Sequence, residues 1–405
     1  MSARAAPVGG PILTRFYLAL GAVAAVGLAM MLWRLFVGLG PATAMTDAHP
    51  WGLWIAFDVV VGTALATGGY AMALLVYVLN RGHYHPLVRS AMLTSALGYS
   101  FGVIGVTLDL GRFWAVWKVP IFFWHWNLNS VLLEVGLCIA LYVAVLWIEV
   151  SPSFLERWAR GDPGPLQRLA RRTLPPLKTA MPWLIALGLL LPTMHQSSLG
   201  SLMLLADQKL HPLWQTPLLP LLFLVSCLAM GFATVVMEST VSAAAFRRPN
   251  DTRLLASLGT TAALVIALYL GIRLLDIVLR GRVGYVLAGD FYSLLFTLEM
   301  ALLLGAMTML LARRYTANAG FLFRAAILIV LGGGLYRFST FLTAYNYQAP
   351  SRYFPAIPET LITLGLVAME IMVFVAVVKR FPILAGVTAA PGPEPRRAAW
   401  ARASL

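Results

Sequence analysis

Ten stretches of about 20 mostly apolar residues run through this 405-residue chain, and each is long enough for a helix to cross the hydrocarbon layer of a membrane. They lie near residues 14–38, 54–79, 90–111, 128–149, 179–202, 217–243, 255–279, 290–312, 321–344 and 357–379. Hydrophobic residues make up 60% of the chain and charged residues 11%, which excludes a soluble globular core. The sequence therefore predicts an all-α polytopic membrane protein with ten transmembrane helices.

The basic residues predict how these helices are oriented. A net charge of +14 could indicate nucleic-acid binding, but the Lys and Arg residues mostly lie between the apolar runs. When the spans alternate, one face of the membrane receives 21 of the 30 Lys and Arg residues and the other face receives six. Cytoplasmic loops are enriched in Lys and Arg. We therefore expect both termini to lie in the cytoplasm.

Several segments outside the spans can be interpreted from composition. The N-terminal run has no small-residue cleavage site, so we expect a retained helix. The Arg- and Pro-rich stretch 151–179 is expected to be a linker at the membrane surface, and the tail from Pro382 is expected to be disordered. Cys138 and Cys227 lie in separate apolar runs, which predicts neither a disulfide nor a cysteine-ligated iron–sulfur cluster.

The first half of the chain carries ionisable residues at one inferred depth. Glu134 lies about one turn inside an apolar span, where a carboxylate is costly and often marks a proton or substrate path. Asp58, Asp109, Arg112 and His195 fall in the same layer, near the outer face. Glu134 and His195 could instead be packing groups, and Asp109 with Arg112, three residues apart, could form a structural ion pair.

The second half has its own embedded charges. They are Glu238, Arg273, Asp276, Glu299, Arg337 and Glu370. Arg273 and Asp276 are again three residues apart, which is the spacing of neighbours on one helix face. The set is typical either of polar contacts that hold helices together or of a proton path.

The histidines argue against a membrane haem held by two of them. Only His195 lies well inside a span, whereas His49, His83, His85, His125 and His211 fall in loops or at helix ends. We find no cluster motif, nucleotide motif or metal-ligand set. The residues that remain are acids, one imidazole and aromatic or apolar walls. They favour a site for a hydrophobic molecule that takes up or releases protons.

Six motifs together resemble the NrfD/PsrC family of quinone-reactive membrane subunits. They are PWGLWIAFD at 50–58, YHPLVR at 84–89, LDLGR at 108–112, NLNSVLLE at 127–134, MHQSSLGSLM at 194–203 and IPETLITLGLVAMEI at 357–371. Within the family the chain looks similar to the ten-helix HybB type, the membrane subunit of periplasm-facing [NiFe] hydrogenases. In such chains we would expect a histidine where Asn129 stands, and here His125 comes just before that position.

The resemblance implies two four-helix bundles flanked by the terminal helices. The expected limits are 1–50 for the first helix and outer loop, 51–203 and 204–345 for the two bundles, 346–381 for the last helix and 382–405 for the tail. It implies a site for menaquinone or ubiquinone in the first bundle, near the outer face and an iron–sulfur partner. Glu134, His195 and Asp58 would handle protons. Asp109, Arg112, Trp124, His125 and Asn129 would shape or border the quinone pocket.

The function expected from this resemblance is a haem-free subunit of the bacterial inner membrane. It would pass electrons between a partner's iron–sulfur cluster, with a hydrogenase catalytic subunit beyond it, and the quinone pool. The same role in another respiratory complex is an alternative, as is a proton-coupled transporter, which would need neither redox partners nor an outer docking face. A passive anchor would have no use for buried acids.

Overall fold

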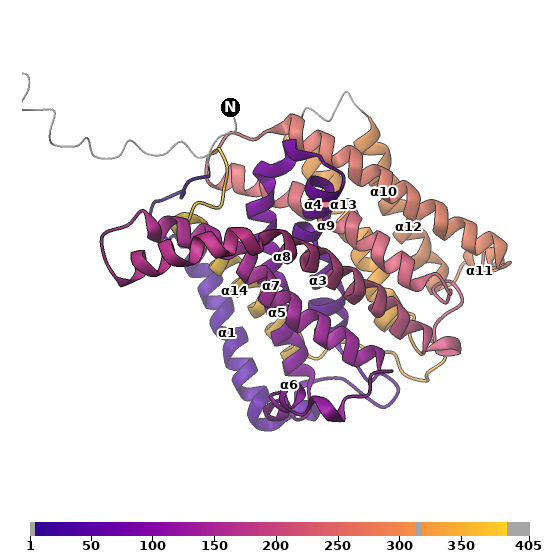
Figure 1. Ribbon diagram of the computed structural model, residues 1–405. Helices are drawn as coiled ribbons and strands as arrows, with labels where there is room; N and C mark the ends of the chain where they lie inside the picture. Colours follow the sequence, from indigo (N-terminus) through magenta and orange to yellow (C-terminus); the bar gives the residue numbers. More distant parts are fainter. Residues whose placement is uncertain (1–4, 313–317, 387–405) are drawn as a thin grey trace, which may run out of the picture.

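The computed structural model describes residues 5–312 and 318–386 (Figure 1). Within these residues ten helical spans are long and apolar enough to cross a membrane, and there is no β-strand. The spans are α1 (Arg15–Val37), a segmented second span (Trp54–Val78), α5 (His85–Asp109), α7 (Val131–Ala159), α8 (Pro165–Leu204), α9 (Leu219–Ala245), α10 (Thr252–Leu279), α12 (Phe291–Leu311), α13 (Ala319–Phe338) continued by η8 (Ser339–Thr343), and α14 (Ile357–Arg380). The prediction of ten membrane helices is confirmed.

Short helices lie in the connections between the spans. They are α2 (Leu39–Ala42), η3 (Gly82–Tyr84), η4 (Phe113–Ala115), α6 (Lys118–Ile121), η5 (Phe123–His125), η6 (Asp207–Lys209) and α11 (Val283–Val286).

The stretch 151–179, expected to be a linker at the membrane surface, is mostly helical. Helix α7 continues to Ala159 and α8 begins at Pro165, which leaves a turn of only a few residues between them. Pro165 occupies the first turn of α8, where the missing N–H costs nothing, and α8 contains four further prolines. The two helices pack along each other as a pair.

The second span and α9 form the centre of the molecule. Among the ten spans they are the most buried: 83% and 78% of the residues in their 18-residue apolar stretches are buried inside the protein. The second span consists of η1 (Trp54–Val61, a π-helix), α3 (Gly62–Leu65), α4 (Gly68–Ala73) and η2 (Leu74–Val78). At the break between α3 and α4, Thr67 lies against Gly231 of α9, where a Cβ would come within 2.8 Å of the Thr67 hydroxyl. Glycine is required there for close packing.

Both ends of the described chain meet at one end of the bundle, which we call the proximal end. The amide of Ala6 donates to the Leu384 carbonyl at 3.3 Å, and that of Val8 donates to the Val378 carbonyl at 3.1 Å. Ile383 and Leu384 are buried. The predicted disorder is therefore wrong for Pro382–Gly386, because this segment packs against the residues before α1, where Ala6 bonds Leu384. Residues 387–405 lie outside the described part. The opposite end, which holds loop 110–130, is the distal end.

The lateral arrangement of the helices is read from their contacts. Helix α7 packs on α5 and α8, while α10, α12 and α13 pack on one another, and α9 contacts α8 on one side and α10 and α13 on the other. In Figure 1 α10 and α12 lie on one side of the molecule, away from α1. The division into two four-helix bundles, with the domain limits given above, stays a prediction.

Helix α1 depends on a glycine contact with α14, which gives a first test. A Cβ added to Gly365 would lie 2.5 Å from the Gly27 Cα, so Gly365→Ala must push α1 away from α14. Overpacking of this kind costs about 1–3 kcal/mol. We expect a lower melting temperature in detergent. Gly271→Ala, where nothing lies within 4 Å of the new methyl group, is the matched control and should melt like the wild type. Equal melting of both variants would contradict the contact.

Candidate functional site

A buried hydrogen-bond network surrounds His195 of α8. Its Nε2 atom lies 3.2 Å from the Thr63 hydroxyl oxygen. Gln196 Nε2 donates to the same oxygen at 3.2 Å and to the Tyr99 hydroxyl at 3.3 Å. The Thr63 hydroxyl donates its own proton to the Val59 carbonyl at 2.6 Å, so its oxygen can only accept. His195 must therefore carry its proton on Nε2.

The other ring nitrogen of His195 is left as an acceptor. His195 is fully buried, and its Nδ1 atom has no hydrogen-bond partner among the described residues. The Tyr99 ring lies 5.7 Å away in an edge-on arrangement and packs in turn on Tyr142 at 4.7 Å. An imidazole with a free lone pair can accept a proton or a hydrogen bond from a bound molecule. The expectation of an embedded histidine is met, and its tautomer follows from the neighbours.

Glu134 lies in the first turn of α7, close to the distal end. Ser130 caps this helix by accepting from the Leu133 amide at 3.3 Å. The Glu134 side chain is half-buried and makes no hydrogen bond with a described residue. Its neighbours Ser130 and Leu133 line an open hollow of about 320 Å³, together with His125. Glu134 therefore adjoins the loop side of the predicted site, and no hydrogen bond links it to His195.

The loop before Glu134 presents aromatic rings at the distal surface. The Phe122 and Trp124 rings pack at 5.3 Å and the Trp124 and His125 rings at 6.0 Å, yet Trp124 is 61% exposed. Asn129 is exposed too, and its amide donates to the Asn127 side chain at 3.1 Å. These residues lie at the distal surface, and their expected role at the border of a quinone pocket stays a prediction.

The proposed Asp109–Arg112 pair does not form. Helix α5 ends at Asp109, and Arg112 lies beyond it with an exposed side chain, so helical i,i+3 geometry does not apply. The cation that acts on Asp109 is Arg34 of α1, which is fully buried and donates to the Leu110 carbonyl at 2.8 Å. Arg34 was missed, although a lone Arg in an apolar span is a signal of the same kind as Asp58.

Asp58 faces a different region from the one expected. It lies in the π-helix η1 and accepts a hydrogen bond from Thr363 of α14 at 2.8 Å. Together with Glu238 and Glu370 it lines a cavity of about 480 Å³. Glu134 and His195 do not line that cavity. The structure therefore groups Asp58 with two acids of the second half, and not in direct contact with the other predicted catalytic residues.

In the second half Arg273 and Asp276, three residues apart on α10, have different polar partners on other elements. Arg273 Nε lies 3.9 Å from the Glu299 carboxylate, while Asp276 accepts from the Thr216 hydroxyl at 2.9 Å. Spacing along one helix does not decide the partner here, because Glu299 on α12 faces Arg273 across the bundle. Tyr269 donates to Glu299 at 2.9 Å and Trp214 at 3.2 Å. Glu299 therefore links Arg273, Tyr269 and Trp214, and we call these four residues the Arg273 cluster.

Arg337 of α13 lies between the two halves. It is fully buried and donates to the Val60 carbonyl at 3.0 Å and to the Phe223 carbonyl. The guanidinium also lies 4.6 Å from the centre of the Phe223 ring. The six residues predicted as a proton path thus form two separate groups: Glu238 and Glu370 at the cavity, and the Arg273 cluster with Arg337 nearby.

Two further acids escaped the sequence analysis. Glu359 is fully buried and accepts from the amides of Ala44 at 3.0 Å and Leu53 at 3.2 Å, and from the Tyr353 hydroxyl. It ties the distal loops together. Glu149 of α7 has two buried carboxylate oxygens without a hydrogen-bond partner. Both acids stand in or beside apolar runs, so the signal that singled out Glu134 was present.

His211, in the connection before α9, is a structural histidine. Its ring stacks on Tyr292 at 4.4 Å, and its Nδ1 atom accepts from the Leu213 amide at 3.2 Å. Burial lowers the pKa of His211 to about 4; the nearby Asp290 opposes this change and Arg282 adds to it. The imidazole is therefore neutral where it packs.

This environment predicts how stability changes with pH. In the unfolded chain histidine titrates near 6.5. Between about pH 6.5 and 4 the unfolded chain therefore binds a proton that folded His211 does not, and stability falls as the pH falls. The variant His211→Asn keeps an acceptor for the Leu213 amide but cannot titrate in this range. We expect its melting temperature to fall less than that of the wild type when the pH is lowered from 7 to 5. The exposed His83→Asn is the control; the same loss in all three proteins would contradict this role.

Comparisons with known proteins agree with this architecture. Residues 41–349 match the family described as polysulphide reductase, NrfD. The chain is 38% identical to the probable Ni/Fe-hydrogenase 2 b-type cytochrome subunit of Escherichia coli K12, over 93% of this chain and 94% of that protein.

Two other relatives come from different complexes. The integral membrane subunit of menaquinone reductase from Nitratidesulfovibrio vulgaris is 34% identical over 41% of this chain and 37% of its own. A selenate reductase subunit of Mesobacillus selenatarsenatis is 28% identical over 66% of this chain and 65% of its own. All three relatives are named as subunits of oxidoreductases. The chain therefore belongs to the NrfD family of integral membrane subunits.

Proposed function

We propose that this chain passes electrons between an iron–sulfur partner and membrane menaquinone or ubiquinone, as the membrane subunit of a [NiFe] hydrogenase complex. The observation that carries the proposal is the buried His195 network, which leaves one imidazole lone pair free. The hydrogenase and menaquinone reductase names of two relatives support the partner and the substrate.

The side chains of the first half suit the proton chemistry of quinones. Reduction of a quinone takes up two protons and oxidation of the quinol releases them. His195 Nδ1 can accept a proton from a quinol hydroxyl, and Glu134 can exchange it at the distal end. Asp109, Arg112 and Asn129 complete the polar border of this site in the proposal.

The partner is proposed to dock at the distal end. Loop 110–130 exposes several aromatic side chains there, among them Trp114, Trp117 and Trp124. Between Leu110 and Leu133 the charged residues are Arg112 and Lys118, so an acidic, partly apolar surface would fit. The excess of Lys and Arg at the proximal end supports cytoplasmic termini in a bacterial inner membrane, with the partner on the periplasmic side.

We also propose that the chain moves protons across the membrane. Glu238 and Glu370 would form a proton path on the proximal side, ending at Asp58, since these three acids share one cavity. Arg273, Asp276, Glu299 and Arg337 would form a second polar region in the other half. Co-purification with cluster-bearing subunits tests the redox role, because a proton-coupled transporter would not retain them.

The residues do not fit a haem held by two histidines. Among the described residues, which include all six histidines, His195 alone lies well inside a span, and its Nε2 is engaged by Thr63. We therefore expect the purified chain to lack the visible absorbance of a b-type haem, although one relative is named a cytochrome subunit. A stoichiometric reduced-minus-oxidised haem spectrum from this subunit alone would contradict the expectation.

Glu134→Gln tests the proton role at the distal end. The amide keeps the size and hydrogen bonding of the side chain but cannot exchange protons. Because a general acid or base contributes roughly 10²–10⁴-fold, quinone-linked turnover of the whole complex should fall at least about tenfold. Reduction of an artificial dye through the partner should continue at the normal rate.

The control for Glu134→Gln is Glu156→Gln on the same helix. Glu156 pairs with Arg89 at 3.0 Å at the proximal end of α7, far along the helix from Glu134. This variant should keep both rates. Retention of both rates by Glu134→Gln as well would mean that Glu134 is only a packing group.

A further inference from the structure

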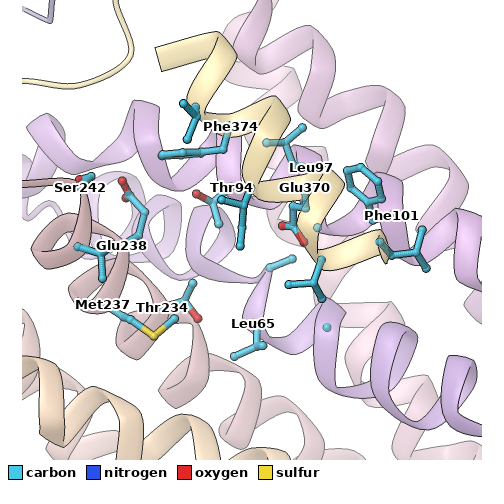
Figure 2. Close-up of a pocket in the computed structure, with 18 of the residues that line it drawn as sticks. Leu65, Thr94, Leu97, Phe101, Thr234, Met237, Glu238, Ser242, Glu370 and Phe374 are labelled. Atoms are coloured by element: carbon cyan, nitrogen blue, oxygen red, sulfur yellow. The ribbon is translucent and has the colours of Figure 1, made fainter. Parts of the chain in front are cut away.

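The acid-lined cavity lies apart from the His195 network and has apolar walls. It has a volume of about 480 Å³ and is lined by residues of the second span, α5, α9 and α14 and by Phe16 of α1; Figure 2 shows a close-up of it. Phe101, Leu97 and Phe374 contribute to the walls. Cavities of this size, mostly apolar with a few polar groups, are typical of sites for small lipophilic molecules.

Several polar groups in this cavity lack partners. Figure 2 shows Glu238 on one side, with Thr94 and Glu370 across the cavity from it. The Thr94 hydroxyl and both carboxylate oxygens of Glu238 are buried without a hydrogen-bond partner among the described residues. The hydroxyls of Ser90 and Ser242 lie close to Glu238 but donate to main-chain carbonyls at 3.2 and 3.3 Å, and Arg248, which donates to the Ser242 hydroxyl, is a cation that acts on this carboxyl.

The remaining acids lie deeper in the cavity. Glu370 makes no hydrogen bond within the described part of the chain. Asp58, which lies close enough to act on Glu370 electrostatically, accepts a hydrogen bond from Thr363. Buried polar groups without partners are costly and rare in proteins. Thr94 and Glu238, with the partly buried Glu370 lining the same cavity, therefore indicate a ligand that carries oxygen atoms into it.

The cavity opens toward lipid at its proximal end. Val241 of α9 is 50% exposed at this opening, and Phe16 at the start of α1 is 63% exposed. Phe246, just after α9, also lies at this end. A molecule could thus leave its apolar tail among the lipids while its polar part lies near the acids.

Three kinds of occupant can be compared on chemical grounds. A phospholipid acyl chain would fill the volume but would leave Thr94, Glu238 and Glu370 without partners. Water could bind these groups, yet apolar cavity regions away from them stay dry. A quinone has a flat ring with oxygens that accept from a hydroxyl or a protonated carboxyl, and its isoprenoid tail suits the apolar opening.

We propose that this cavity binds the head group of an isoprenoid quinone at a second site, separate from the distal one. The inference rests on the proposed quinone-linked function. Thr94 donates to a ring oxygen, the carboxyl of Glu238 or Glu370 holds another, and the tail leaves past Val241. The π-helix η1, which supplies Phe57 and Asp58 to the wall, is a feature often found at functional sites.

The test is photolabelling of the whole complex with an azido-quinone that has a short isoprenoid tail, followed by peptide mapping. We expect labelled peptides from α9 or α14 at the cavity, and unlabelled quinone should compete. Val241→Trp should block the opening and reduce this labelling at least about tenfold, the change that 1.4 kcal/mol of lost affinity produces. Its side chain is half exposed, so folding should be retained.

Two matched controls and a second variant make the result decisive. Val278→Trp on α10, a 61% exposed position outside the cavity, should label like the wild type. Thr94→Val keeps the volume, removes the unpartnered hydroxyl and should weaken labelling about fivefold, as expected for one neutral hydrogen bond. Thr260→Val, an exposed threonine on α10, should not weaken it.

The outcomes separate this proposal from the proposed function. Label confined to the distal peptides, with quinone-linked turnover intact, overturns the second site alone. Cavity labelling that is unchanged in both Val241→Trp and Thr94→Val also overturns it. So does labelling of the cavity by a photoreactive phospholipid that quinone fails to displace. If neither the cavity peptides nor the distal peptides carry label that unlabelled quinone can displace, and quinone-linked turnover is also absent, the proposed function is overturned as well.

Discussion

The guanidinium of Arg337 joins the two halves of the molecule at their centre. It donates to the Val60 carbonyl of the second span and to the Phe223 carbonyl of α9. In a hydrocarbon layer every main-chain group must find a partner within the protein. The π-helix η1 interrupts the regular ladder of helical hydrogen bonds, so carbonyls near its end need other donors. Arg337 supplies one of them, which lets an irregular helix persist in the core.

The irregular second span in turn places the polar side chains. Asp58 in η1 faces α14 and the acid-lined cavity, while Thr63 in α3 faces His195 on α8. These residues are five positions apart, and they belong to two different groups of polar side chains. A break at Ala66–Thr67 then lets α9 approach closely at Gly231. One distorted helix thus supplies residues both to the His195 network and to the carboxyl-lined cavity.

The existence and order of the spans could be predicted from the sequence, because the length of an apolar run relates directly to membrane thickness. The depth of Glu134 and His195 followed from the same runs. Which helix each side chain faces could not be predicted, because rotation about a helix axis is set by packing. Arg273 therefore lies near Glu299 on another helix, and Asp109 lies near Arg34.

The contact between α1 and α14 has a consequence for biosynthesis. Helix α1 leaves the ribosome long before α14, yet the two pack at Gly27 and Gly365, and Ala6 pairs with Leu384, which follows α14. During translation α1 must wait in the lipid without its partner while eight other spans are inserted. The contact can form only after α14 has been made, so a chain that ends before α14 would expose an unpaired α1 that membrane quality control could recognise.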